Sequence, residues 1–287
     1  MARPVPALLL VLLAACAHEP ERNPIAEWVP SPNHDVRDPI IVVIHATEQG
    51  SVEESLDTLR TRNSGGPVSS HYLVGDDGRI YQLVPDALRA WHAGGGRWGT
   101  ITDLNSASIG IELDNDGSEP FTDAQVDSLL VLLEDLTDRH GIPRTAVIAH
   151  ADMAPTRKRD PGAHFPWATL AEAGFGSWPD GTLVDPPPGF DPWMALRLLG
   201  YSLDDRTPQD ERAAAVRAFH RHFRGMDDGD DPGATLDAED ARILFALVGG
   251  NNDPGSGCCT ILVQCPATRR PSTPSPRRSH GWTEASA

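Results

Sequence analysis

The sequence predicts an α/β protein with a mixed central sheet flanked by helices, followed by a small C-terminal three-helix domain. Strand-like and helix-like patterns alternate over residues 40–175, which is typical of an α/β domain. A Pro-rich stretch interrupts them at residues 179–190, and helical spacing of apolar residues resumes after it. The chain of 287 residues is long enough for two domains of ordinary size.

Two predicted strands lead directly into histidines. Residues 40–44 form a continuous run of Ile and Val, as expected for a strand buried on both faces, and His45 follows the run. Residues 147–149 form a shorter strand that leads into His150. Both imidazoles are therefore expected at strand ends, where functional side chains often collect.

Three further strands are predicted between these histidines. Residues 69–74 and 79–84 flank the turn sequence GDDG at 75–78, whose residues tolerate positive φ, so the two strands form a hairpin. Residues 108–113, SIGIEL, form the third strand.

A long helix is predicted over residues 121–140. Its apolar residues recur at helical spacing, and Thr122 and Gln125 form a capping-box pair at its start. Gly141 and Pro143 end it.

His45 and His150 gain significance from a carboxylate. Asp160 follows His150 by ten residues, and the turn at Pro161 and Gly162 directs the chain back toward it. Two imidazoles and one carboxylate suit a catalytic zinc ion, which uses three protein ligands and leaves a fourth position for water. The alternative is that each histidine is a hydrogen-bonded structural residue.

The acidic composition argues against a nucleic-acid partner. The formal net charge is −17 and the pI is near 4.9. Binding to a phosphate backbone depends on a basic surface, which this composition does not favour.

The N-terminus predicts export and lipidation. Arg3 precedes an apolar run at residues 7–15, which is too short to span a bilayer, and the run ends at Cys16 in a sequence that resembles a bacterial lipobox. Ala17 then favours periplasmic anchoring at the outer membrane of a Gram-negative cell. A plain signal peptide with a chance cysteine is the alternative. Residues 250–287 are predicted to be disordered, and Cys258, Cys259 and Cys265 receive no assigned chemistry.

Six sequence blocks occur in a recognisable order: IVVIHAT, VSSHYLVGDDGRIYQLV, AWHAG, LNSASIGIEL, IAHADMAP and KRDPGAHFPW. Together they resemble the amidase-2 family of N-acetylmuramoyl-L-alanine amidases over about residues 29–175. The resemblance implies a zinc-dependent hydrolase. Its substrate would be the amide bond between N-acetylmuramic acid and the L-alanine of the stem peptide, in peptidoglycan or muropeptides.

The resemblance also implies roles for individual residues. His45, His150 and Asp160 correspond to the zinc ligands, Glu112 to the catalytic carboxylate and Lys158 to its cationic partner.

The chemistry of amide hydrolysis is consistent with the last two roles. Glu112 can accept a proton from water and pass it to the departing nitrogen, although a carboxylate in this strand could instead point to solvent. Lys158 can stabilise the oxyanion, and it is the only lysine among 24 basic residues.

Five more residues in the family blocks are candidates for substrate contact or for support of the ligands: His71, Trp91, His92, Asn105 and His164. A core role is the alternative for Trp91, and hydrogen bonding to a strand is the alternative for His71.

The sequence divides into a signal peptide (1–16), a catalytic domain (25–178), a linker (179–190), a helical domain (191–249) and a tail (250–287). Helices are expected at residues 194–201, 209–223 and 237–248. They resemble a peptidoglycan-binding domain, although His220 replaces the usual Gln. The alternative is a bundle that only braces the catalytic domain.

Three functions are compatible with these patterns. The first is a monomeric zinc amidase anchored by a lipid, the second a non-catalytic peptidoglycan-binding lipoprotein, and the third an unrelated hydrolase with zinc-like spacing. A pure binding protein has no need of Glu112 or Lys158, so the sequence favours the amidase.

Overall fold

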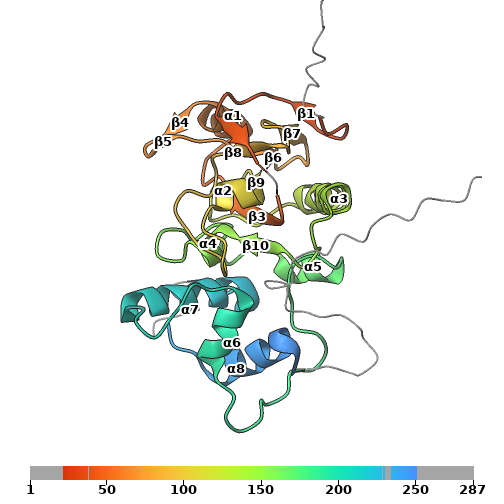
Figure 1. Cartoon of the computed structure of the whole chain (residues 1–287). Helices are drawn as coiled ribbons and strands as arrows, with labels where there is room; N and C mark the ends of the chain where they lie inside the picture. Colours follow the sequence, from red (N-terminus) through yellow and green to blue (C-terminus); the bar gives the residue numbers. More distant parts are fainter. Residues whose placement is uncertain (1–21, 38, 228, 230–233, 251–287) are drawn as a thin grey trace, which may run out of the picture.

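The computed structural model describes residues 22–250 except 38, 228 and 230–233. The predictions for Cys16 and for the tail cysteines therefore lie outside the described residues. An α/β unit forms the upper part of the molecule, and three helices lie below it (Figure 1). Among the described residues, no helix has both the length and the apolar character needed to cross a membrane.

A six-stranded mixed sheet is the centre of the α/β unit, which confirms the predicted fold class. Its order is β1-β7-β6-β9-β3-β10, and only the β6–β7 pair is antiparallel. The strands are β1 Glu27–Trp28, β3 Ile41–Ala46, β6 Tyr72–Val74, β7 Ile80–Gln82, β9 Ser108–Leu113 and β10 Val147–Ala149. Two short ladders lie beside it: β2 (His34–Val36) with β8 (Leu88–Ala90), and β4 (Arg62–Asn63) with β5 (Gly66–Pro67).

Strand β3 has parallel neighbours on both sides, and all six of its residues are buried, as the continuous apolar run predicted. On one side, His45 pairs in register with Glu112 of β9. On the other, Ile44 pairs with Ala149 of β10. This register brings the end of β10, and His150 after it, next to His45.

Helices cover both faces of the sheet. They are α1 Val52–Arg60, α2 Leu104–Ala107, α3 Asp123–His140, α4 His150–Met153 and α5 Trp167–Glu172. One core cluster joins the apolar side of α3 to residues such as Ile44 and Ile111. A second cluster joins Val43 and Ile148 to Leu104 and Met153 on the opposite face.

Helix α3 occupies most of its predicted range. The Thr122 side chain accepts a hydrogen bond from the Gln125 backbone N–H, at 3.1 Å, and Gly141 ends the helix with φ of 65°. The Gln125 side chain donates instead to the carbonyl oxygens of Val74 and Asp114, so only half of the predicted capping box forms. Tertiary contacts with the sheet edge compete for this amide.

Helix α1 was not predicted from the sequence. Ser51 caps it by accepting from the Glu54 N–H, and only Ser55 and Leu59 are buried within it. Such a short buried stripe gives a weak periodic signal.

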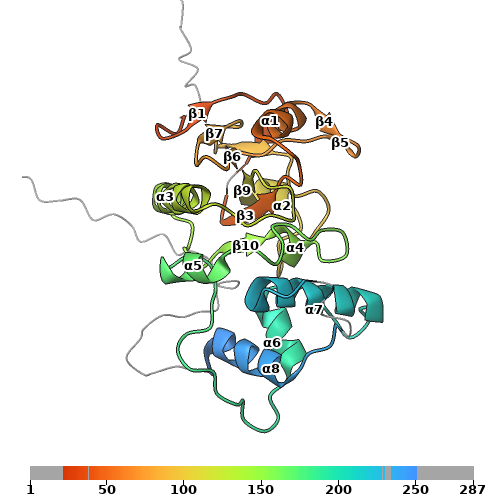
Figure 2. The same cartoon turned by 180° about the vertical axis from the view of Figure 1, so that it is seen from behind.

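The last three helices form what we call the helical unit: α6 Pro192–Leu199, α7 Gln209–Arg224 and α8 Ala238–Phe245. All three overlap the predicted ranges. From both sides of the molecule, α7 lies below α4 and the β10 edge of the sheet (Figures 1 and 2).

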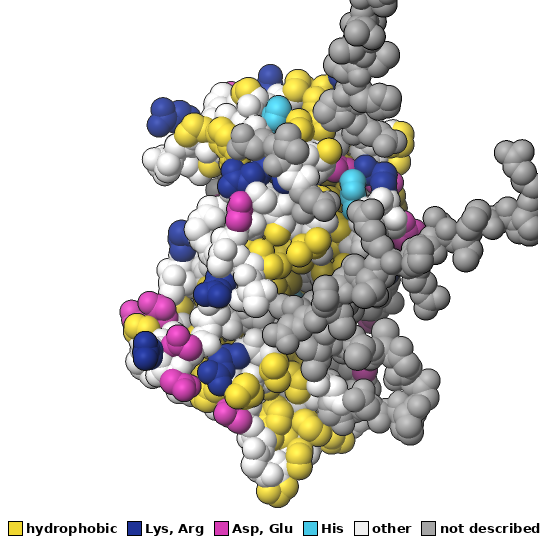
Figure 3. All heavy atoms as spheres, in the orientation of Figure 1, with side chains coloured by type: hydrophobic (Ala, Val, Ile, Leu, Met, Phe, Trp, Pro, Cys, Tyr) yellow, Lys and Arg dark blue, Asp and Glu magenta, His cyan; other side chains and the backbone are white. Residues whose placement is uncertain are grey.

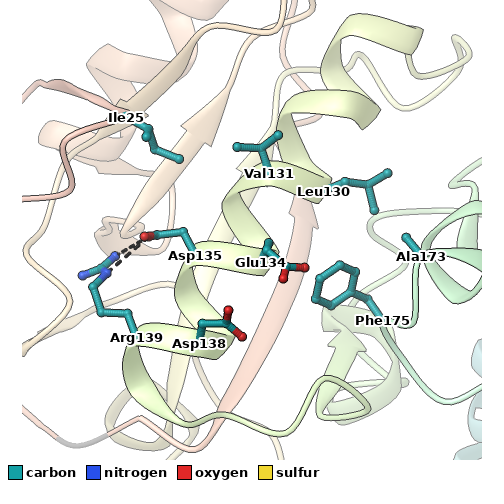
Figure 4. Close-up of a pocket in the computed structure, with 9 residues that line it drawn as sticks. All are labelled: Ile25, Leu130, Val131, Glu134, Asp135, Asp138, Arg139, Ala173 and Phe175. Atoms are coloured by element: carbon teal, nitrogen blue, oxygen red, sulfur yellow. Dashed lines mark hydrogen bonds and ion pairs between the residues drawn. The ribbon is translucent and has the colours of Figure 1, made fainter.

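On the face shown in Figure 3, basic side chains lie singly or in small groups among apolar and acidic ones, over the part that the structure describes. A broad hollow of about 770 Å³ lies elsewhere, along the outer side of α3 (Figure 4). Ile25, Val131 and Phe175 line it together with the acidic side chains of α3. None of the residues proposed for the metal or for catalysis contributes to this hollow.

A buried carboxylate ties α3 to the hairpin. Asp86 accepts hydrogen bonds from the Tyr72 hydroxyl at 2.6 Å and from Arg139 at 2.6 Å, and its Oδ2 lies 3.0 Å from His140 Nε2. Burial alone would raise the pKa of Asp86, but these hydrogen bonds and the charge of Arg139 lower it to about 2.

We predict that Asp86 makes the free energy of unfolding depend on pH in the acid range. Its folded pKa lies below the ordinary value of 3.8, so the stabilisation is complete above about pH 4 and is lost as the pH falls toward 2. The shift corresponds to about 2 kcal/mol. In chemical denaturation at pH 6, Asp86→Asn should have a lower free energy of unfolding than wild type. Between pH 4 and pH 2, its free energy of unfolding should fall less than that of wild type. Asn at the exposed Asp76 is the control, and equal slopes for Asp86→Asn and wild type would contradict the prediction.

Candidate active site

The structure brings the three predicted metal ligands together in a buried cluster. One ligand atom each from His45, His150 and Asp160 lies within 4.8 Å of the others. Asp160 Oδ2 lies 2.9 Å from His150 Nδ1 and 3.2 Å from His45 Nδ1. Both imidazoles therefore face the carboxylate with the same ring nitrogen.

The fold explains this convergence. His45 lies near the end of β3, and His150 begins α4 immediately after the adjacent parallel strand β10. The loop after α4 returns so that the Ala151 N–H donates to the Asp160 carbonyl at 2.9 Å. Parallel neighbouring strands end at the same edge of a sheet, which places His45 and His150 together, and the loop after α4 brings Asp160 to them.

The cluster has the donor set of a catalytic zinc site. Two imidazole nitrogens and one carboxylate can occupy three positions of a tetrahedron and leave the fourth open. Asp160 Oδ1 is buried and has no hydrogen-bond partner among the described residues, and the nearest cation, Lys158 Nζ, is 4.0 Å away. An orphaned carboxylate oxygen in a buried site is costly without a cation, so these residues fit a metal ion.

A chain of hydrogen bonds sets the tautomer of His45. The Ser108 hydroxyl donates to the Leu104 carbonyl, so Ser108 Oγ accepts from His92 Nε2, 3.2 Å away. His92 Nδ1 is then an acceptor for His45 Nε2–H, at 2.9 Å. The proton of His45 therefore lies on Nε2, and the Nδ1 lone pair points toward the metal position.

His150 is oriented by the backbone. Its Nε2 lies 3.0 Å from the Ala93 carbonyl oxygen, to which it donates, and this leaves Nδ1 free to bind a metal. Arg157 donates to the same oxygen at 2.6 Å. Asn105 Oδ1 accepts from the backbone N–H groups of His92 and Ala93, which holds this segment in place.

Burial gives the ligands the charge states that a metal needs. Desolvation and the nearby His150 lower the pKa of His45 to about 4. Burial opposes ionisation of Asp160, but the charges and hydrogen bonds of His150 and His45 hold its pKa well below the usual range. Near neutral pH, His45 is therefore a neutral imidazole and Asp160 an ionised carboxylate, the states in which these groups bind a metal.

Glu112 faces the same site from β9. Its Oε1 lies 3.9 Å from His45 Nδ1, and the side chain is 12% exposed, so it does not point to solvent. Burial, followed by the negative charge of Asp160, raises the pKa of Glu112 to about 8. A carboxyl group that titrates close to neutral pH is suited to both accept and donate a proton.

Lys158 lies at the rim of the site. Its side chain is 37% exposed, with Nζ on the Asp160 side of the cluster. The amine can therefore reach both solvent and a bound ligand.

Two residues expected to contact substrate have other contacts. His71 is fully buried, its Nε2 lies 2.9 Å from the Leu88 carbonyl, and its Nδ1 accepts from the Gly110 N–H at 3.0 Å. The His92 ring is hydrogen-bonded to His45 through Nδ1 and to Ser108 through Nε2. Neither ring has a nitrogen left for substrate, so the contacts favour support, which was one of the two roles predicted for these residues, over substrate contact.

The other three predicted substrate residues remain predictions. Trp91 and Asn105 are half-buried and His164 is exposed.

Sequence reasoning missed two supporting residues. Ser108 is buried at the start of β9, and Arg157 donates to the Ala93 carbonyl, which orients His150. Arg157 is one of two arginines in TRKR, and Ser108 looks like an ordinary strand residue, so neither had a distinguishing signal.

Comparison with known proteins decides the family. Residues 35–163 match the family model of N-acetylmuramoyl-L-alanine amidases. N-acetylmuramoyl-L-alanine amidase AmiD of Escherichia coli K12 is 41% identical in an alignment of 211 residues that covers 64% of this chain and 74% of AmiD. The chain belongs to this amidase family. The family is catalytic, and the curated relatives are amidases.

Other amidases are also similar to this chain in sequence or in structure. The 1,6-anhydro-N-acetylmuramyl-L-alanine amidase AmpD of Escherichia coli K12 is 33% identical over 162 residues, or 50% of this chain and 88% of AmpD. The structure of AmiD with the substrate anhydro-N-acetylmuramic acid-L-Ala-D-γ-Glu-L-Lys has 35% identity and a TM-score of 0.63, covering 80% of this chain and 93% of AmiD. The structure of Pseudomonas aeruginosa AmpDh3 with anhydromuramic pentapeptide has 30% identity and a TM-score of 0.64, covering 83% of this chain and 98% of AmpDh3.

We predict that the amidase needs His92 for tight metal binding. His92→Ala removes the acceptor that fixes the His45 tautomer, so zinc affinity should fall about 10- to 100-fold, the usual effect of losing a residue behind a metal ligand. Competition with a fluorescent chelator measures this. His34→Ala, on β2 and outside the cluster, is the control, and unchanged affinity in His92→Ala would exclude the tautomer relay.

Proposed function

We propose that this amidase hydrolyses the bond between N-acetylmuramic acid and L-alanine with zinc held by His45, His150 and Asp160. The carrying observation is the buried convergence of these three ligands beside Glu112. A binding protein without catalysis would gain nothing from a buried carboxylate oxygen that accepts no hydrogen bond and a second buried carboxyl group in one site.

Zinc at these ligands would supply Lewis acidity toward water and the scissile carbonyl. Glu112 accepts the proton of the attacking water, for which its burial and proximity to His45 are suited. The same carboxyl group then returns the proton to the leaving nitrogen. His45 and His150 keep their own protons on Nε2 and do not compete for this one.

Lys158 stabilises the negative charge that develops on the carbonyl oxygen. Its ammonium is a compact charge on a flexible stem, and its half-exposed position lets it approach a bound substrate. The nearby Asp160 carboxylate keeps this amine on the metal side of the rim.

The proposed substrate is a muropeptide. The support comes from AmiD and AmpDh3, whose structures contain anhydromuramic acid joined to peptides, and from AmpD, whose name specifies the 1,6-anhydro form. We infer that this enzyme accepts anhydro-muramyl peptides.

We further propose that the enzyme is a lipoprotein of the periplasm, anchored through Cys16 to the outer membrane. The support is the lipobox-like sequence at residues 13–16 and the chemistry of the substrate, which occurs in the cell wall. The helical unit is proposed to contribute to peptidoglycan binding, in line with its sequence resemblance.

Replacing Glu112 by Gln tests the catalytic assignment. The amide cannot accept the proton, so release of stem peptide should fall about 10²- to 10⁴-fold. Mass spectrometry of products from a defined anhydro-muropeptide measures this. Gln at Glu172, an exposed carboxylate on α5, should leave activity unchanged.

Metal content separates catalysis from binding. Protein lacking residues 1–16 should contain about one zinc per chain by elemental analysis, as a three-ligand catalytic site does. Glu112→Gln should keep that zinc. If it loses zinc together with activity, Glu112 is a ligand and the proposed division of roles is wrong; if wild type binds no zinc, the metal assignment fails.

A further inference from the structure

Helix α4 lies between a glycine-rich loop and the helical unit. The loop, residues 94–99, contacts it from one side, where the Arg97 N–H donates to the Met153 carbonyl at 2.8 Å. A Cβ added to Gly96 would lie 2.6 Å from the Met153 carbonyl oxygen, a backbone atom that cannot easily move, so glycine is needed for this approach. Helix α7 packs on α4 from the helical unit. Since His150 is the first residue of α4, both neighbours contact the short helix that begins with a proposed metal ligand.

The buried side chain of Asp152 links α4 to the helical unit. Its Oδ1 accepts from the Tyr201 hydroxyl at 2.6 Å. Its Oδ2 accepts from the Ala149 N–H at 2.9 Å and lies 2.7 Å from His222 Nδ1, which donates to it. Ala149 directly precedes His150, so the carboxylate fixes the peptide that leads into the ligand. Two of its three donors come from 49 and 70 residues further along the chain.

Packing holds both donors in place. The Tyr201 ring is 2% exposed and contacts Trp98 edge to face, with centroids 5.1 Å apart. The His222 ring stacks on Trp167, with centroids 3.8 Å apart and 17° between the planes, and also on Phe223. Neither side chain can turn away from Asp152 without disrupting these contacts.

The backbones of the two parts also meet closely. The Gly99 N–H donates to the Gly200 carbonyl at 2.7 Å. A Cβ at Gly200 would lie 2.2 Å from the Trp98 ring, and the φ of 137° also favours glycine there. The glycine-rich loop, α4 and the helical unit therefore form one packed assembly around the metal-ligand segment.

We propose that the helical unit is a structural part of the metal centre, with Tyr201 and His222 as positioning residues that act on His150 through Asp152. This inference rests on the proposed function in one respect, the assignment of His150 as a zinc ligand. Loss of the Tyr201 hydroxyl leaves the buried Oδ1 of Asp152 without a donor, and loss of His222 leaves Oδ2 with the Ala149 N–H alone; either change costs free energy and frees the carboxylate to move. The Ala149 peptide then loses its fixed orientation, and His150 no longer meets the metal in a set direction.

The competing explanation is that the helical unit only stabilises the fold. Both explanations predict lower thermal stability when Tyr201 or His222 is changed. Only the positioning role predicts weaker metal binding by protein that remains folded.

The test uses full-length mature protein and zinc alone. Tyr201→Phe removes the hydroxyl and keeps the ring, and His222→Leu removes the donor. His222→Asn keeps an N–H close to the position of Nδ1. Tyr72→Phe is the matched control, because Tyr72 donates a hydrogen bond of the same 2.6 Å length to buried Asp86, in the hairpin network.

Zinc affinity is measured by chelator competition at a temperature where circular dichroism shows every variant folded. Tyr201→Phe and His222→Leu should each weaken zinc binding about tenfold, at the lower end for residues behind a ligand. His222→Asn should recover most of the affinity. Tyr72→Phe should lower the melting temperature without changing zinc affinity.

Two outcomes would overturn the inference. In the first, Tyr201→Phe and His222→Leu bind zinc as tightly as wild type while melting earlier, which leaves only a bracing role. In the second, Tyr72→Phe weakens zinc binding equally, which shows a general effect of stability. If wild type itself binds no zinc, the proposed function fails instead, and the two failures are distinguishable. Should His222→Leu not fold, Tyr201→Phe alone decides the matter.

Discussion

The parallel pairing of β3 with β9 and β10 is the constraint on which the rest of the structure depends. It places His45 opposite Glu112 and brings the end of β10, where His150 begins α4, beside His45. A shift of one residue in either pairing would turn these side chains to the opposite face of the sheet. The buried apolar face under α3 makes such a shift costly, so core packing and site geometry are set by the same hydrogen bonds.

Burial then divides the two carboxyl groups of the site into different roles. Two imidazoles, those of His45 and His150, lie close to one oxygen of Asp160. Their stabilisation of the ionised form outweighs desolvation, so the pKa of Asp160 is low. Desolvation and the negative charge of Asp160 both oppose ionisation of Glu112, so its pKa is raised to about 8. One carboxylate suits a metal, and the other suits proton transfer. Two carboxyl groups whose environments separate their pKa values are a common basis for acid and base assignments.

Support for the site comes from a wider part of the chain than the region matched by the family model. His92, Ser108 and the Leu104 carbonyl set the His45 tautomer from within residues 35–163. Tyr201 and His222 lie beyond that region and reach α4 through Asp152. The helical unit therefore packs on the same short helix that begins with the proposed ligand His150, which links its fold to the geometry of the candidate site.

The sequence by itself determined the mixed sheet, α3, the hairpin and the His45, His150, Asp160 and Glu112 set, because periodicity, turn residues and ordered motifs are local signals. It could not assign His71, His92 or Asp152. Whether a histidine contacts substrate or supports another histidine depends on which partner each ring nitrogen meets, and those partners, such as Ser108 for His92 and His222 for Asp152, are distant along the chain. Only tertiary packing decides such contacts, since hydrogen bonds depend on ångström-scale distance and direction that a sequence pattern does not encode.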